Sequence, residues 1–176
     1  MRPSTSMSLH CVRLLALLMA SLVFTQWVTA AERPNIILLM GDDHGWDETG
    51  YNGHPHLKTP VLDQMAASGL RLDRFFSGHP SCSPTRVSVL TGRHPNRCGT
   101  FAPNFSIRPE EISVATILKR AGYATAHFGK WHLGDQPDFM PTNQGFDSYF
   151  GIPYSNDMNR KHAPLPLVRD QTVIEA

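Results

Sequence analysis

Cys82 and Arg86 stand four residues apart, on either side of Pro84. Pro84 suits the first position of a helix, Ser83 suits its N-cap, and Gly92 suits its end. At such a helix start Cys82 would lie where unpaired N–H groups and the positive end of the helix dipole favour an anion. Arg86 would lie about one turn further along, with a permanent positive charge. This spacing predicts a nucleophile beside a group that stabilises negative charge.

A pair of carboxylates, Asp42 and Asp43, directly follows a short apolar run. At a sharp turn two adjacent carboxylates can converge on one hard cation such as calcium or magnesium. The alternative is an ordinary Asp-Asp turn. The position after an apolar run favours the metal interpretation, because ligands bind at the carboxyl ends of the strands in open α/β sheets.

A lysine and a histidine, Lys130 and His132, stand two residues apart at the end of a second apolar segment. If this segment is extended, the two side chains point to the same face. An ammonium beside an imidazole suits an anionic oxygen and its leaving group. The alternative is a solvated pair on a loop.

The elements that would position these groups alternate between strands and helices, which favours an α/β fold. The apolar run over 35–40 is typical of a strand buried on both faces. Capping and stop residues mark the helices, and no strand or helix is expected near the C-terminus to close a sheet edge. The predicted strands are 35–40, 70–76 and 123–129, and the predicted helices are 60–68, one starting at 84, and 114–120.

The first thirty residues predict a secretory signal peptide. Arg2 and Arg13 precede an apolar run over 14–28, and small residues follow at a suitable cleavage position. The alternative is an uncleaved membrane anchor, which fits less well because the apolar run is short for a span and contains Ser21, Thr25 and Gln26. Without this segment the chain holds 14 basic and 15 acidic residues, a net charge of −1 with neutral histidines. This composition gives no support to nucleic-acid binding, and no later run is long enough to span a membrane. The expected location is therefore periplasmic or secreted.

Two cysteines, Cys82 and Cys98, lie beyond the signal segment. An export compartment permits a disulfide between them, which is the structural alternative to a nucleophile at position 82. Two cysteines at this spacing do not make a metal framework.

The motifs together resemble the type I sulfatases of the alkaline-phosphatase-like superfamily. Cys-x-Pro-x-Arg at 82–86 followed by Thr-Gly resembles their first signature, with Thr85 where Ser or Ala is more common. The run from Gly122 to Gly134 resembles their second signature almost position for position. The segment 145–157 is also similar, and Ser155 matches a position that contacts substrate in some members. The implied fold is an alkaline-phosphatase-like α/β domain with a mixed or mostly parallel sheet flanked by helices.

The resemblance implies a sulfatase mechanism. A maturating enzyme would oxidise Cys82 to formylglycine, and one hydroxyl of the hydrated aldehyde would attack the sulfur of a sulfate ester. Asp42, Asp43 and the modified Cys82 would bind Ca²⁺ or Mg²⁺. Arg86, Lys130 and His132 would complete the catalytic group, with Lys130, His132 and Ser155 holding the substrate. Export favours a sulfated carbohydrate as this substrate.

The resemblance also implies a shortfall, because family members supply a further Asp-Asn metal pair and a further Lys or His from a later part of the sheet. Residues 31–176 are therefore expected to be the N-terminal part of a catalytic domain, with an incomplete fold and an incomplete metal site. Three alternatives stay open. They are a phosphonate or phosphodiester hydrolase of the same superfamily, a thiol-based phosphatase, and a non-catalytic exported remnant. The phosphatase fits poorly, because such loops place five residues between cysteine and arginine.

Overall fold

The computed structural model describes residues 33–157 and 164–175. The predicted signal peptide lies outside these residues. The chain divides into two compact units, Met1–Gly41 and Asp42–Ala176, and the second holds every helix and strand of the described residues. The helices are α2 (Pro60–Ser68), α3 (Cys82–Thr91), α4 (Pro95–Cys98) and α5 (Val114–Arg120), with 3₁₀ turns at Gly50–Asn52, Pro137–Phe139 and Pro141–Asn143. The strands are β1 (Ala126–Phe128), β2 (Ser148–Gly151), β3 (Leu167–Arg169) and β4 (Thr172–Glu175).

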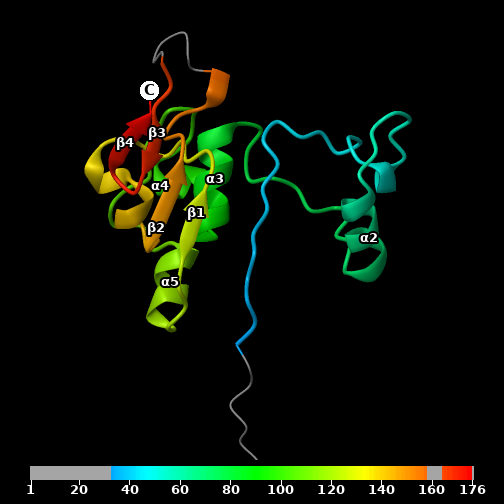
Figure 1. Cartoon of the computed structure of the whole chain (residues 1–176), viewed down its shortest axis with the longest axis horizontal. Helices are drawn as coiled ribbons and strands as arrows, with labels where there is room; N and C mark the ends of the chain where they lie inside the picture. Colours follow the sequence, from blue (N-terminus) through cyan, green and yellow to red (C-terminus); the bar gives the residue numbers. More distant parts are fainter. Residues whose placement is uncertain (1–32, 158–163, 176) are drawn as a thin grey trace, which may run out of the picture. The chain divides into compact units, whose positions relative to one another are not determined.

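The four strands form one mixed sheet in the order β1-β2-β3-β4 (Figure 1). Strands β1 and β2 are parallel, with Ala126 opposite Ser148, whereas β3 runs antiparallel to both β2 and β4. The sequence predicted neither β2 nor the hairpin β3–β4. The expectation that no strand follows near the C-terminus is therefore wrong, because residues 167–175 pair with each other and extend the sheet.

Helix boundaries follow local signals in the sequence. Helix α2 begins at Pro60 after Thr59 and ends before Gly69, as predicted. Helix α5 is capped by Ser113, whose hydroxyl accepts the N–H of Thr116 at 3.0 Å. These termini were predictable because caps, proline and glycine act within one turn of the chain.

Two predicted strands are absent. Residues 34–40 have no regular secondary structure, and Ile37 and Leu39 are 81% and 73% exposed. A strand exists only through the ladder that it makes with a neighbour, and no described residue pairs with this run. Residues 70–76 form an exposed irregular segment with a turn at 73–74 for the same reason. An apolar run can therefore favour β-structure and still form no strand, because the run does not supply the neighbouring strand with which it would pair.

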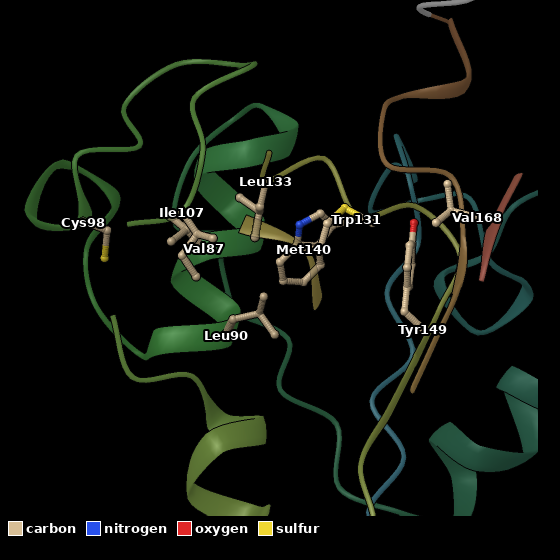
Figure 2. Close-up of a cluster of buried hydrophobic side chains, with 9 residues drawn as sticks. All are labelled: Val87, Leu90, Cys98, Ile107, Trp131, Leu133, Met140, Tyr149 and Val168. Carbon is tan, nitrogen blue, oxygen red and sulfur yellow. The ribbon is translucent and has the colours of Figure 1, made fainter. Parts of the chain in front are cut away.

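The core lies between the helices and the sheet of the second unit. Val87 and Leu90 on α3 face Trp131, while Tyr149 on β2 and Val168 on β3 bring the sheet to the same cluster (Figure 2). Further buried side chains come from the end of α4 and from the connecting segments, namely Cys98 on α4 and Ile107, Leu133 and Met140 on the connections. Because Trp131 follows Lys130 and precedes His132, packing of the core also fixes the backbone of that pair.

Candidate active site

Helix α3 carries Cys82 as its first residue and Arg86 one turn later, so both lie on one side of the helix. The helix starts two residues earlier than predicted, with Ser81 rather than Ser83 in the N-cap position. Pro84 is tolerated as the third helical residue, because the N–H groups of the first turn have no partner within the helix. Gly92 ends the helix with φ 67°, as predicted.

Asp42, Asp43 and Cys82 lie together, with one ligand atom from each within 4.8 Å of the others. Asp43 adopts a left-handed φ of 51°, which turns the backbone sharply between the two carboxylates and the residues that follow. Among the described residues this is the group of acidic, histidine or cysteine side chains whose spacing suits a metal ion. The carboxylates suit a hard cation, whereas the thiol of Cys82 is a softer ligand.

Lys130 connects the carboxylates with the cysteine. Its Nζ donates to both carboxylate oxygens of Asp42, at 2.9 and 3.0 Å, and to Sγ of Cys82 at 3.3 Å. Burial would raise the pKa of Asp42, but the hydrogen bonds and charge of Lys130, with the charge of Arg86, lower it overall. Asp42 is thus a carboxylate held between two cations.

Arg86 and His127 meet at one backbone carbonyl. The Arg86 guanidinium donates to the carbonyl oxygen of Lys130 at 2.5 Å, and its other nitrogen lies 3.4 Å from Asp42. Nε2 of His127 lies 3.2 Å from the same carbonyl, and since a carbonyl only accepts, this nitrogen donates. His127 was predicted to be structural, and its ring lies among Trp131 and Tyr149. It nevertheless contacts the backbone of a site residue.

His132 follows a turn rather than an extended segment. Gly129 (φ 97°) and His132 (φ 56°) both have positive φ, so simple strand alternation does not set the direction of the His132 side chain. Burial, followed by the positive charges of Lys130 and Arg86, lowers the pKa of His132 to about 4. Since this value lies well below 7, His132 is a neutral hydrogen-bonding group at neutral pH, and the positive charge comes from Lys130 and Arg86.

Ser155 is buried in the loop after β2, near the backbone that pairs with His132. The N–H of His132 donates to the carbonyl of Pro153 at 3.1 Å. The Ser155 hydroxyl hydrogen-bonds to Asp157 and lowers the pKa of that carboxylate. Ser155 therefore lies two residues after the carbonyl that accepts from His132, but the contact of its own hydroxyl is with Asp157.

Both described cysteines are free, so the structure contradicts a disulfide between Cys82 and Cys98. Cys98 is fully buried beside the Thr91 hydroxyl, whereas Cys82 is partly exposed. Sequence reasoning missed Asn104, whose Oδ1 lies 2.9 Å from Nε2 of His132. No signal in the sequence marks it, because an asparagine in a proline-containing loop is also typical of an ordinary turn.

Comparison with known proteins identifies the family of this chain. A family model described as Sulfatase matches residues 34–175. The chain belongs to the sulfatase family. Sulfatases are sulfuric ester hydrolases, and the family generally uses formylglycine and a divalent metal. This sulfatase chain is 40% identical over 161 residues to mouse N-acetylgalactosamine-6-sulfatase, and 45% identical over 136 residues to rat arylsulfatase G.

These matches cover 82% and 74% of the sulfatase chain but 31% and 26% of the two relatives. The chain therefore spans about a third or less of the length of these curated relatives.

Solved structures agree on the fold. The PsFucS1 sulfatase from Pseudoalteromonas matches with a TM-score of 0.65 at 29% identity, over 84% of this chain and 32% of that one. A structure described as a complex with its substrate D-glucosamine-2-N,6-O-disulfate matches with a TM-score of 0.68 at 30% identity. That match covers 81% of this chain and 28% of the other. The sheet and its helices are thus part of the alkaline-phosphatase-like sulfatase fold. Among the described residues, no helix is both long and apolar enough to cross a membrane.

Proposed function

We propose that residues 31–176 are the N-terminal part of a sulfatase catalytic domain, in which formylglycine made from Cys82 serves the hydrolysis of a sulfate ester. The observation that carries the proposal is the position of Cys82. It begins helix α3, its Sγ accepts from Lys130, and it lies within 4.8 Å of ligand atoms of Asp42 and Asp43. The thiol of Cys82 therefore lies close to both the ammonium group of Lys130 and the carboxylates of Asp42 and Asp43.

The donor set fits a hard divalent cation, Ca²⁺ or Mg²⁺. Asp42 and Asp43 offer carboxylate oxygens, and a formylglycine at position 82 would offer a third oxygen in place of sulfur. Both oxygens of Asp42 accept from Lys130, so the cation must share or displace one of these hydrogen bonds. Three protein ligands are fewer than calcium takes, so water, substrate or further protein oxygens complete the shell. A bound cation supplies Lewis-acid stabilisation of negative charge on oxygen.

The remaining side chains act on the sulfate group. Lys130 and Arg86 provide fixed positive charge from buried positions, where electrostatic interactions are stronger than in water. Arg86 is held by the Lys130 carbonyl, so its guanidinium needs no reorientation as negative charge develops. His132 is neutral and contributes hydrogen bonding, which suits a group that moves a proton at the reacting oxygens.

The proposal includes a substrate class and a location. The relatives named N-acetylgalactosamine-6-sulfatase, and the neighbour in complex with D-glucosamine-2-N,6-O-disulfate, support a sulfated carbohydrate as the substrate. Ser155 would contact it from the loop after β2. Residues 1–30 would act as a signal peptide for periplasmic or secreted export, and a maturating enzyme would act on Cys82. Sequencing the N-terminus of the exported chain tests the cleavage site.

The central experiment is peptide mass analysis of the chain produced together with a formylglycine-generating enzyme. Conversion of Cys82 to formylglycine removes about 18 Da from its peptide. The Cys98 peptide is a control within the same molecule, because that thiol is fully buried and lies outside the motif. Pro84→Ala should reduce the conversion, since the resemblance makes this proline part of what the enzyme recognises. A Cys82 peptide with an unmodified mass would contradict the proposal.

The nearest alternative is a phosphonate or phosphodiester hydrolase with the same modified cysteine. The converted protein is offered an aryl sulfate and an aryl phosphonate at equal concentration, and Cys82→Ala serves as the blank. Faster release of the phenol from the aryl phosphonate than from the aryl sulfate favours the alternative. If a fully converted chain releases the phenol from neither substrate, the non-catalytic remnant is favoured.

A further inference from the structure

The two ring nitrogens of His132 have different surroundings. Nε2 lies 2.9 Å from Oδ1 of Asn104, whereas Nδ1 is buried and has no hydrogen-bond partner among the described residues. An amide oxygen only accepts, so Nε2 carries the hydrogen in this contact. In a neutral imidazole the other nitrogen then holds a lone pair. The contact with Asn104 therefore decides which nitrogen of His132 is the acceptor.

The opposite amide orientation is less favourable. If the amide of Asn104 were turned, its NH₂ group would donate to Nε2, and Nδ1 of His132 would become a buried N–H without a partner. Orphaned buried N–H groups are rarer in proteins than under-satisfied acceptors.

Asn104 is itself held in place from both sides. Its backbone N–H donates to the hydroxyl of Ser83 at 3.2 Å, and Ser83 is fully buried directly after Cys82. Its φ of 69° is left-handed, a conformation that asparagine accepts more readily than most residues. The backbone of Asn104 is thus attached to the first turn of α3, while its side chain reaches His132. It joins the helix that carries Cys82 to the turn that carries Lys130.

We propose that Asn104 is a positioning residue of this site, which fixes His132 as the Nε2–H tautomer and keeps Nδ1 as a hydrogen-bond acceptor. The role of that acceptor in sulfate-ester hydrolysis rests on the proposed function, but the tautomer does not. A lone pair at Nδ1 does not bind an unprotonated sulfate oxygen, because both are acceptors. Such a lone pair can accept a hydrogen bond from a hydroxyl group instead, while Lys130 and Arg86 supply donors for the sulfate oxygens.

The test is the ¹⁵N NMR spectrum of the histidine side chains of the 176-residue chain at neutral pH. His132→Gln assigns the signals by their loss. Asn104→Gly removes the carboxamide but keeps a residue that accepts positive φ, so the backbone is not strained. Asn104→Asp keeps an acceptor and adds negative charge. Asn96→Gly is the control, since this asparagine is exposed and its side chain makes no hydrogen bond with any described residue.

The wild-type chain and Asn96→Gly should show His132 as the Nε2–H tautomer, with a proton that exchanges slowly with water. Asn104→Gly should lower the ratio of Nε2–H to Nδ1–H tautomer by about three- to tenfold, as expected for one lost hydrogen bond, and should abolish slow exchange. Asn104→Asp should keep the tautomer and raise the pKa of His132.

A wild-type ring in the Nδ1–H form would overturn the proposal, and so would an unchanged tautomer ratio in Asn104→Gly. Loss of the Nε2–H form in Asn104→Asp would also overturn it. These measurements need neither a modified Cys82 nor turnover. A chain that fails to hydrolyse sulfate esters therefore leaves this result standing, and the wrong tautomer leaves the proposed function standing.

Discussion

Trp131 is the residue whose replacement should most damage the second unit and the site together. Its side chain is 1% exposed, and its Nε1–H donates to the carbonyl of Phe139 at 2.9 Å. Its ring meets those of His127 and Phe146 edge-on, at centroid distances of 5.2 and 6.2 Å. Trp131→Ala removes these contacts and leaves a cavity in the core, at a residue whose chain neighbours are Lys130 and His132. The chain offers a matched control in Trp46, which is 68% exposed.

The expected magnitudes follow from these surroundings. Replacing a buried tryptophan with alanine lowers the free energy of unfolding by about 3–5 kcal/mol, through lost transfer energy and the cavity left behind. Trp131→Phe keeps part of the ring but leaves the Phe139 carbonyl without its donor, which costs about 1–3 kcal/mol. Trp46→Ala should change the free energy of unfolding by no more than about 0.5 kcal/mol, as is usual for an exposed position.

The assay is urea denaturation followed by far-UV circular dichroism, which does not depend on tryptophan fluorescence. With a slope of about 1–3 kcal/mol per molar urea, Trp131→Ala should lower the midpoint by about 2 M. A second readout is the amide NMR spectrum, in which the signals of Lys130 and His132 should move in Trp131→Phe and stay in place in Trp46→Phe. Equal midpoints for the two alanine variants would refute the assignment of Trp131 to the centre of the core.

Two further predictions concern the strands and the pH dependence. A Cβ added to Gly151 would overlap the carbonyl oxygen of Gly129 and come within 2.6 Å of its carbonyl carbon, so Gly151→Ala should cost about 2–3 kcal/mol. Gly45→Ala, whose Cβ meets its neighbours at 3.4 Å, should cost less than about 0.5 kcal/mol, and equal thermal midpoints would contradict this contrast. Because the pKa of folded His132 is about 4 rather than 6.5, its contribution to the free energy of unfolding is complete above pH 6.5 and is lost as the pH falls towards 4. Urea titrations should show about 3 kcal/mol less acid destabilisation over this range in His132→Gln, and parallel curves would contradict the burial of this ring.

Local signals predicted helices α2, α3 and α5 well, missed the four-residue helix α4 in a segment expected to be a loop, and predicted the sheet poorly. Pro60, the Ser113 cap and Gly92 act within a few residues of the ends of α2, α5 and α3, so they indicate helix ends without any knowledge of the fold. The run over 35–40 has a clear β-preference, but a ladder needs a second strand, which a single segment does not specify. The β3–β4 hairpin was missed because each strand is only three or four residues long.

The candidate site was predictable where a motif carried it. The motifs predicted Asp42, Cys82, Arg86 and Lys130 as residues of one site. Hydrogen bonds and ion pairs in the structure join these four residues. Asn104 and His127 were not predictable as contacts of the site, because each acts through one hydrogen bond to a residue distant in sequence or to a backbone atom. Such contacts depend on which loops come close together in the fold, and neither composition nor periodicity predicts this.

The segment over 129–132 contributes both to the packing of the core and to the candidate site. Its backbone is held by Gly151 against Gly129 and by the hydrogen bond from the Trp131 N–H to the carbonyl of Ile152, at 2.9 Å. The Lys130 carbonyl within this turn accepts from Arg86, so a shift of the turn would move both cations of the site together. Burial of Trp131 therefore does more than stabilise the core. It sets the distance between the positive charges and Cys82, and through this the electrostatic environment of the residue proposed to become formylglycine.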